Sequence, residues 1–363
     1  MNFNVIKSDM NEIFCHNVNY YNLKNQTVVL TGAYGMLASY ITYFLMFLNK
    51  EHSYNTKIVV MVRNGEKFYN LFRTCEYFNE KDIKVIEYDF SSLFSFDCGD
   101  IKADYIIHTA SFASPNYYAV KPVEVLMPNI FGTRFLLDFA YKSKCKGFLL
   151  FSSGDVYGDF SSRADVKEGA LVSENLYGCM DPLDIHSCYS ESKRMAETMC
   201  YSFYKEYGVP IKIARIAHTY SPTMNIDSDP RVFSSFVKNI IEKKNIVMYS
   251  DGKSRRCFTY ITDAVAAYFK ILLEGKSGEA YNVCNTEEFY SIRELAEMLV
   301  GLYPEYKLGV EYKQRSSSES YTENNLQSVK SFITDNGKLK DLGFVFKVSA
   351  EDGFKRVITY LQK

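Results

Sequence analysis

The chain of 363 residues has almost no net charge, because its 42 lysines and arginines are balanced by 43 aspartates and glutamates, which leaves −1 at pH 7. Proteins that bind nucleic acid or anionic membranes through electrostatics carry a clustered basic excess. The composition therefore argues against a nucleic-acid partner and against a membrane partner. Specificity must come from a local pocket.

The nine cysteines form no Cys-x-x-Cys pair, and no secretory signal opens the chain. Zinc sites and disulfide frameworks depend on such spacing, so we expect no metal site and reduced thiols in a cytoplasmic protein. Long apolar runs are missing too. The most lipid-like stretch, Met36–Leu48, is shorter than the roughly 20 residues that span a bilayer and contains several hydroxyl side chains, which predicts a buried helix.

A glycine turn is the first informative feature that is present. The short apolar strand Thr27–Thr31 is followed at once by Gly32, Gly35 and Ala38, and then by a helix to about Asn49. This is the order of a dinucleotide-binding turn. Gly32 permits the tight turn, Gly35 lets the backbone approach a pyrophosphate, and Ala38 keeps the helix close to the strand. Other tight strand-to-helix turns share part of this pattern.

The next buried strand, Lys57–Val62, ends where this fold usually places an acid that binds the adenine ribose hydroxyls. Arg63 follows the strand instead. An arginine at this point can stack on adenine or accept a 2′-phosphate, so Arg63 leaves the choice between NAD and NADP open.

Further apolar segments alternate with helical ones along the first two thirds of the chain. The predicted strands are Lys84–Tyr88, Asp104–His108, Gly147–Ser152 and Ile211–Ile216. This alternation predicts an α/β fold with a doubly wound parallel sheet of the Rossmann type. Ligands of such sheets bind at the carboxyl ends of the strands, where the segments 108–110 and 152–157 fall.

Tyr189 and Lys193 are four residues apart in a strongly helical stretch, so they share one helix face. Met195, Met199 and Phe203 give the same helix an apolar stripe. A fixed cation beside a phenol favours the phenolate, and a tyrosine near its ordinary pKa of about 10 would be a poor base at neutral pH. The spacing therefore indicates a catalytic pair, although a tyrosine and a lysine on a solvated helix face would look the same.

The chain changes character after Ile216, and its length also predicts two lobes. We expect an N-terminal extension without a clear period, packed on the surface, over residues 1–24. Residues 25–216 are expected to form the dinucleotide-binding domain. Residues 217–363 are expected to form a smaller α/β substrate-binding lobe, interleaved with the first. Predicted helices of this lobe cover Val232–Lys243, Asp263 to about Glu274, and Ser349–Leu361.

Two features of this second lobe bear on ligands. The adjacent Arg255 and Arg256 follow a glycine turn, and guanidinium groups can grip a diphosphate, although a solvated basic turn is the alternative. Ser291 and Glu294 form a capping box that opens a helix to about Leu302. The segment Gln314–Ser331 is rich in Ser, Asn and Glu and is expected to be a mobile loop, either a lid or a connector.

From about Asn25 onward these motifs resemble the extended short-chain dehydrogenase/reductase family of nucleotide-sugar enzymes, and within it most closely the UDP-glucuronate decarboxylases. The matching pieces are Gly32-x-x-Gly35-x-x-Ala38, His108-Thr-Ala-Ser-x-Ala-Ser-Pro115, Asn129-x-x-Gly-Thr133, Ser152-Ser-x-x-Val-Tyr-Gly158, Cys188-Tyr-x-x-x-Lys-Arg-x-Ala-Glu-Thr-Met-Cys200, Arg231-Val-Phe and Arg256-Cys-Phe-x-Tyr-Ile-x-Asp263.

The resemblance implies roles for individual residues. Tyr189 would remove a proton from a sugar 4-hydroxyl while hydride leaves C4 for the nicotinamide, Lys193 would keep the tyrosine acidic, and Ser153 would bond the same oxygen. Asn129 would buttress the helix of Lys193, and Asp155 would act on the sugar. The implied cofactor-binding residues are Gly32, Gly35, Met36, Arg63, Asp89, Phe90, His108, Ala110, Asn129, Tyr189 and Lys193. The implied substrate-binding residues are Ser153, His218, Arg231, Val232 and Arg256.

The chain departs from these apparent relatives at positions whose residues distinguish one reaction of the family from another. Decarboxylases usually read Thr-Ser-Glu and 4,6-dehydratases Thr-Asp-Glu before Val-Tyr-Gly, whereas this chain has Ser153-Gly154-Asp155. His218 also stands where the family commonly has Asn. The resemblance implies an NAD-dependent nucleotide-sugar enzyme, a decarboxylase first and a 4-epimerase second, with a 4,6-dehydratase less favoured. A silent dinucleotide-binding subunit is the non-enzymatic alternative, and a homodimer is implied.

Overall fold

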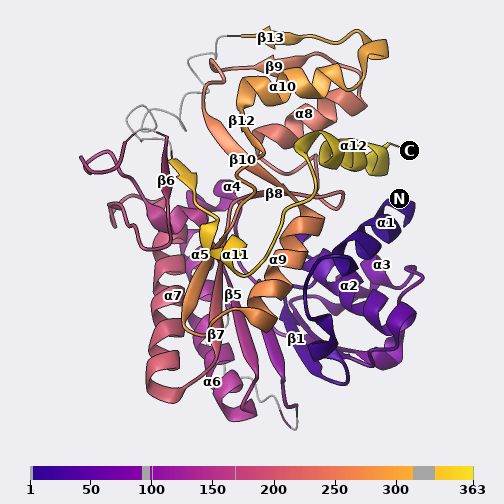
Figure 1. Ribbon diagram of the computed structural model, residues 1–363, viewed down its shortest axis with the longest axis vertical. Helices are drawn as coiled ribbons and strands as arrows, with labels where there is room; N and C mark the ends of the chain where they lie inside the picture. The colour runs from indigo at the N-terminus through magenta and orange to yellow at the C-terminus, as the bar shows by residue number, and fades with distance from the viewer. Residues whose placement is uncertain (1–2, 92–98, 100, 168, 314–331, 363) are drawn as a thin grey trace.

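The computed structural model describes residues 3–91, 99, 101–167, 169–313 and 332–362. Within these ranges, seven parallel strands form one sheet in the order β11-β7-β5-β4-β1-β2-β3 (Figure 1). Their bounds are β1 Thr27–Thr31, β2 Lys57–Val62, β3 Ile83–Glu87, β4 Tyr105–His108, β5 Gly147–Ser153, β7 Ile211–Ile216 and β11 Glu279–Val283. The doubly wound α/β fold is thus confirmed, and the predicted strands agree with the structure to within one residue at each end.

Helices cover both faces of this sheet. They are α2 Met36–His52, α3 Gly65–Phe72, α4 Pro115–Tyr118, α5 Pro122–Met127, α6 Thr133–Ser143, α7 Ser187–Tyr207 and α9 Ile261–Glu274, with a π-turn at Pro128–Gly132 and 3₁₀ turns at Tyr20–Leu23, Glu80–Asp82 and Gly154–Tyr157. Because strand side chains alternate, Val28 and Leu30 of β1 enter one apolar core while Val29 enters the other. Both faces are therefore buried, as a parallel sheet requires.

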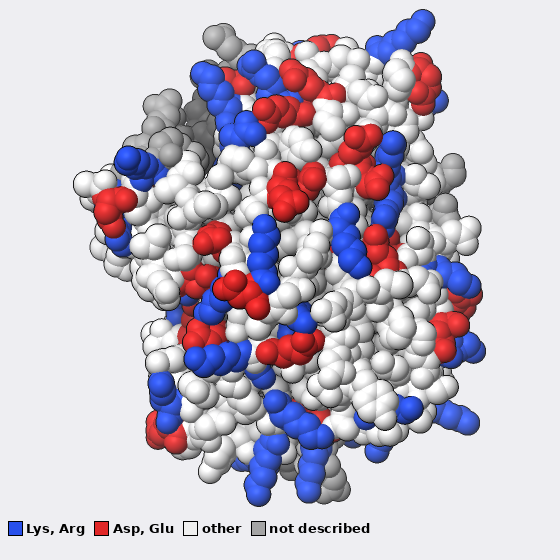
Figure 2. All heavy atoms as spheres, viewed as in Figure 1, with Lys and Arg blue, Asp and Glu red and all other residues white. Residues whose placement is uncertain are grey.

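The predicted buried helix is confirmed, since α2 is buried from Ala38 to Leu48. In the part of the chain that the structure describes, no helix is long and apolar enough to cross a membrane. On the face shown in Figure 2, acidic and basic side chains lie interspersed, in keeping with the balanced composition.

The second lobe is built on a small sheet in the order β12-β10-β8. Its strands are β8 His218–Tyr220, β10 Arg255–Tyr260 and β12 Phe289–Ser291, and its helices are α8 Val232–Ile241, α10 Ile292–Gly301, α11 Gly337–Asp341 and α12 Ala350–Leu361. Two-stranded pairs join β9 Ile246–Met248 to β13 Val310–Tyr312, and β6 Ala170–Val172 to β14 Phe332–Thr334, with a 3₁₀ turn at Pro304–Tyr306. The capping box of Ser291 and Glu294 is confirmed. Residues 314–331, where a lid or connector was expected, lie outside the described residues.

The chain returns to the large sheet after residue 216. Strand β11 pairs with β7 in parallel register, Glu279 opposite Lys212, and α9 packs against β5 and β7. Residues after position 216 therefore share the large sheet with residues before it, so the two regions of the sequence are interleaved in space. The assignment of three domains stays a prediction.

The N-terminal segment differs from the expectation. Residues Phe3–Phe14 form the helix α1, whose Ile6, Met10 and Ile13 are buried in the main core. The interpretation of this stretch as an aperiodic surface extension was wrong, because a buried Asp9 interrupts an otherwise helical apolar stripe. Helix α1 packs on α2, α9 and α12.

Asp9 is fully buried where these elements meet. Its Oδ2 accepts hydrogen bonds from the Tyr40 hydroxyl of α2 at 2.8 Å and from the Tyr260 hydroxyl of β10 at 2.7 Å, and its Oδ1 accepts one from Arg356 of α12 at 3.1 Å. Burial outweighs these bonds and raises the pKa of the Asp9 carboxyl to about 6. One carboxyl therefore connects the N-terminal helix to both lobes.

Candidate active site

A cavity of about 2070 Å³ lies between the large sheet and the second lobe. Its walls combine the carboxyl ends of β1 and β5, the start of α2, one face of α7 and the edge of β10. The predicted site residues that line it are Gly32, Gly35, Met36, Arg63, Asp89, Phe90, Ala110, Ser153, Asp155, Tyr189, Lys193, His218, Arg231, Val232 and Arg256. The fold therefore brings together residues from distant parts of the sequence.

The turn between β1 and α2 fits a dinucleotide. Gly32 has φ +66°, and a Cβ there would lie 3.2 Å from the Ala110 Cα and 3.2 Å from the Thr109 Oγ1, so only glycine permits this approach. Gly35 precedes α2 with extended backbone and supplies no capping side chain. The first N–H groups of a helix have no intrahelical partner, and those of α2 begin at the cavity wall, as the diphosphate of NAD requires.

Arg63 extends from the end of β2 along the cavity wall. Its guanidinium lies over the ring of Phe112, with Cζ 4.4 Å from the ring centroid. Asn64 accepts a hydrogen bond from the backbone N–H of Lys67 and so caps α3. Within the described part of the chain, Arg63 makes no ion pair. The guanidinium edge stays available for an adenosine or its phosphate.

Two predicted cofactor residues do not line the cavity. His108 is buried behind it, with Nδ1 3.0 Å from the Thr31 Oγ1, and burial lowers the pKa of its imidazole to about 3. Asn129 is buried too, and its amide donates to the Ser192 Oγ at 2.9 Å and to the Val125 carbonyl at 3.1 Å. Asn129 thus contacts the helix that carries Lys193, the position in which a buttress would act, whereas His108 supports the end of β1.

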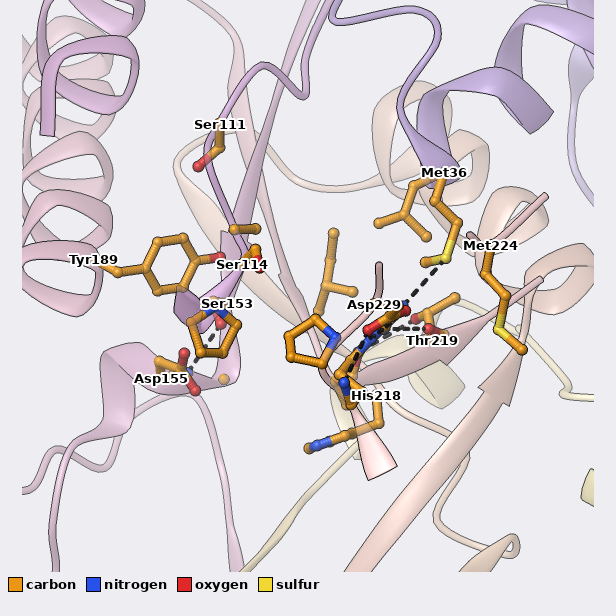
Figure 3. Close-up of a pocket in the computed structure, with 18 of the residues that line it drawn as sticks. Met36, Ser111, Ser114, Ser153, Asp155, Tyr189, His218, Thr219, Met224 and Asp229 are labelled. Atoms are coloured by element: carbon orange, nitrogen blue, oxygen red, sulfur yellow. Dashed lines mark hydrogen bonds and ion pairs between the residues drawn. The ribbon is translucent and has the colours of Figure 1, made fainter. Parts of the chain in front are cut away.

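Tyr189 and Lys193 lie on the face of α7 that borders the cavity, and the Tyr189 hydroxyl points toward Ser153 (Figure 3). The Lys193 Nζ lies 5.8 Å from the Tyr189 ring centroid and donates to the Phe151 carbonyl at 2.7 Å. Both side chains are buried. The two residues predicted from their spacing are therefore buried side by side at the cavity wall, and their catalytic role stays a prediction.

The pKa of Tyr189 is shifted in the direction opposite to the one expected from the sequence. Burial and the nearby charge of Asp155 raise the pKa of Tyr189, and a hydrogen bond with Ser153 opposes them. Burial lowers the pKa of Lys193 to about 7, and the charge of Glu197 opposes that shift. Desolvation acts on both members of the pair and exceeds the lysine's attraction for a phenolate, an effect that a helix pattern does not reveal.

Ser153 and Asp155 lie at the end of β5. The Ser153 Oγ accepts a hydrogen bond from the Asp155 backbone N–H at 3.1 Å and so caps the following turn. The Asp155 carboxyl opens onto the cavity; desolvation raises its pKa, and the charge of Arg256 on the opposite wall lowers it. Between them, a Cβ added to Gly154 would meet only the Ile216 carbonyl, at 3.9 Å. This part of the cavity therefore has free space next to a carboxyl group.

The second lobe supplies the basic wall. Arg255 pairs with Glu294, with a shortest N–O distance of 2.9 Å, and the Nη1 of Arg256 donates to the neighbouring carbonyl of Arg255. Both arginines line the cavity, and their grip on one ligand stays a prediction. His218 stands nearby, and burial with the charges of Arg256 and Arg231 lowers the pKa of its imidazole to about 3, so its ring is neutral at pH 7.

Arg231 bridges the two lobes. Its Nε donates to Asp229 at 2.9 Å, its Nη1 to the Thr219 carbonyl at 2.9 Å, and its Nη2 to the Met36 sulfur at 3.3 Å. Val232 follows at the cavity wall and is 39% exposed. Arg231 therefore ties the dinucleotide turn to the second lobe as well as facing the cavity.

Several cavity residues escaped the sequence analysis. Tyr118 stacks on Tyr189, with ring centroids 5.1 Å apart and planes 11° from parallel. Ser111 buries a hydroxyl that has no hydrogen-bond partner among the described residues. Phe112 underlies Arg63. All three belong to the segment between His108 and Pro122, whose small and aromatic residues follow a strand end and could have indicated a ligand loop.

Comparisons with known proteins agree with this geometry. The model of the NAD dependent epimerase/dehydratase family matches residues 28–284. The chain is 32% identical over 272 residues to UDP-glucuronic acid decarboxylase 4 of Arabidopsis thaliana, covering 75% of this chain but only 56% of that relative. It is 31% identical over 277 residues to UDP-glucuronic acid decarboxylase 6 of the same plant, covering 75% of this chain and 73% of the relative.

A similar fold occurs in a solved structure of UDP-glucuronic acid 4-epimerase from Bacillus cereus in complex with NAD. The TM-score is 0.71 at 22% sequence identity, and the match covers 93% of this chain and 100% of the other. At this identity the likeness concerns the fold alone.

Proposed function

The chain belongs to the NAD dependent epimerase/dehydratase family, and from that premise we propose that it oxidises a nucleoside-diphosphate hexuronic acid at C4 and then decarboxylates it. The observation that carries the proposal is the meeting of Tyr189, Lys193 and Ser153 in one cavity, with a dinucleotide turn at one end and a basic wall at the other. The match to UDP-glucuronic acid decarboxylases supports the choice of sugar, although the first of these relatives is covered over only 56% of its length.

The reaction needs the tyrosine as an acid and a base. Tyr189 takes the proton from the sugar 4-hydroxyl, and Ser153 donates a hydrogen bond to the same oxygen. Lys193 holds the dinucleotide ribose. NAD held between the glycine turn and Lys193 would supply reversible hydride transfer, and the positive charge of its nicotinamide would favour the phenolate form of Tyr189 that burial disfavours. Tyr118 stacks on the Tyr189 ring and so supports its orientation.

Oxidation makes the uronic acid labile. A 4-keto hexuronic acid is a β-keto acid, so carbon dioxide leaves from C5 while the electron pair moves into the ketone, and C5 is then protonated. The chain must hold the carboxylate and supply that proton. Arg256 is the candidate for the first task, because among the arginines that the second lobe contributes to the cavity it is the one for which the described residues give no carboxylate at ion-pair distance. Asp155 is the candidate for the second, because its carboxyl lines the cavity close to Tyr189 and Ser153.

A second candidate function is 4-epimerisation. It requires the keto sugar to turn over before hydride returns, and the free space at Gly154 favours it. Dehydration is disfavoured because Gly154 replaces the middle acid that the 4,6-dehydratases carry. A silent dinucleotide-binding subunit would have no need to keep Tyr189, Lys193 and Ser153 together.

Incubation with UDP-glucuronate separates these functions. Carbon dioxide with a UDP-pentose product supports decarboxylation, and UDP-galacturonate without carbon dioxide supports epimerisation. Turnover of a neutral UDP-hexose with no reaction of any uronic acid would contradict the proposed substrate, and no turnover of a broad panel of nucleotide sugars would contradict the enzyme.

We further propose a homodimer through α6 and α7. On these helices Phe139 and Phe203 are buried within the chain, while Met195 and Tyr207 of α7 are 49% and 47% exposed. Exposed apolar side chains along one long helix favour a second copy as the partner.

A further inference from the structure

Glu197 lies one helical turn beyond Lys193 on α7 and is almost buried, with 12% of its side chain exposed. Its Oε1 accepts a hydrogen bond from the Ser152 Oγ at 2.5 Å and from the Arg215 Nε at 3.0 Å, and its Oε2 accepts one from the Arg215 Nη2 at 2.7 Å. Ser152 of β5 and Arg215 of β7, which are paired across the sheet, thus both hold the carboxylate.

The Ser152 contact has a consequence for the neighbouring residues of β5. The Phe151 carbonyl accepts a hydrogen bond from the Lys193 ammonium, and Ser153 projects into the cavity toward Tyr189. Two bonds, Lys193 to Phe151 and Glu197 to Ser152, therefore join α7 to the end of β5. The relative position of Ser153 and Lys193 depends on that pair of bonds, because adjacent strand residues cannot move independently.

The charge of Glu197 also acts on Lys193. Burial lowers the pKa of the lysine to about 7, and Glu197 is the largest influence in the opposite direction. The charge of Lys193 itself helps to lower the pKa of His108 on β4. The titratable and charged groups around Lys193 are Tyr189, Glu197 and Cys200 on α7, His108 on β4, Arg215 on β7 and Asp155 after β5.

We infer that Glu197 is a positioning residue for the oxidation proposed above, which holds the end of β5 against α7 and keeps Lys193 in its ammonium form. The inference rests on the proposed function for the role of Lys193. This role gives a reason for the three hydrogen bonds that hold Glu197, which lies behind the residues lining the cavity.

The test is the pH dependence of dinucleotide binding in Glu197→Gln, which keeps the shape of the side chain and removes its charge. A charged ammonium binds ribose oxygens more strongly than an amine, so affinity for NADH falls as pH rises through the pKa of Lys193. In Glu197→Gln the midpoint of that fall is expected about one pH unit lower, the usual scale for losing a close opposite charge. NADH fluorescence titrations on protein freed of nucleotide measure it.

Glu191→Gln is the matched control, because Glu191 lies on the same helix, is 39% exposed and pairs only loosely with Arg194, at 3.7 Å. Its midpoint should equal that of the unmodified protein. Equal midpoints for Glu197→Gln and the control would overturn the inference, as would NADH affinity in the unmodified protein that does not change with pH. Because this assay contains no nucleotide sugar, its outcome is separate from that of the substrate test.

Ser152→Ala tests the other part of the inference, that Glu197 holds the end of β5 against α7. It keeps the inference testable if Glu197→Gln does not fold. It keeps the charge but removes the link to β5, so the midpoint should stay in place while kcat falls about tenfold with KM unchanged, as a small misplacement of reacting groups predicts. An unchanged kcat, or a midpoint that moves downward by a full unit, would contradict the role assigned to this link.

Discussion

Asp9→Asn should change how the stability of the protein depends on pH. The pKa of the buried Asp9 carboxyl is raised from 3.8 to about 6, so the folded state binds its proton more tightly than the unfolded state. The stabilisation that this proton provides is complete below pH 3.8 and is lost as pH rises through about 6. A shift of about two pKa units corresponds to about 3 kcal/mol, or about 4 °C in Tm for a chain of this size.

Thermal unfolding of the two proteins between pH 4 and pH 8 measures the effect. The Tm of Asp9→Asn minus that of the unmodified protein should rise by about 4 °C across this range, since asparagine cannot ionise. Glu12→Gln is the control, because Glu12 also contacts Arg356 but is partly exposed, and such an ion pair contributes about 1 kcal/mol or less. Curves of Tm against pH that run parallel for Asp9→Asn and the unmodified protein would refute the raised pKa of the buried Asp9 carboxyl.

Three further predictions concern the site and the assembly. Tyr189→Phe should keep the fold and the cofactor but lower turnover at least about a hundredfold, and turnover at the unmodified rate would refute the assigned base. The purified protein should retain NAD(H), because a hydride that leaves and returns needs a cofactor recycled in place; mass spectrometry that recovers a stoichiometric 2′-phosphorylated dinucleotide would instead assign Arg63 to a phosphate. Light scattering at micromolar concentration should give a dimer, and a monomer would refute the proposed contact through α6 and α7.

The sequence predicted those parts of the molecule that depend on neighbouring residues. The glycine turn at Gly32, the strands of the large sheet and the capping box at Ser291 have local patterns, and each occurs in the structure where it was expected. Tyr189 and Lys193 share a helix face for the same reason. The glycine turn after β1 and Ser153 of β5 reach one cavity because a parallel sheet collects its strand ends at one edge.

The rest depends on long-range packing that no local pattern records. Strand β11 joins the large sheet by pairing with β7, although most of the second lobe's strands lie elsewhere. Helix α1 was missed because Asp9 is polar yet buried among partners from α2, β10 and α12. The raised pKa of Tyr189 depends on how completely the fold excludes water, a quantity that residue spacing does not contain.

The most direct test of oxidation at C4 follows one hydrogen atom. UDP-glucuronate carrying deuterium at C4 would be converted in ordinary water and the product examined by NMR and mass spectrometry. If the hydride leaves C4 and returns within one turnover, the product keeps deuterium at C4, and a decarboxylated product gains one hydrogen from solvent at C5. A UDP-sugar product with solvent hydrogen at C4 would contradict the account.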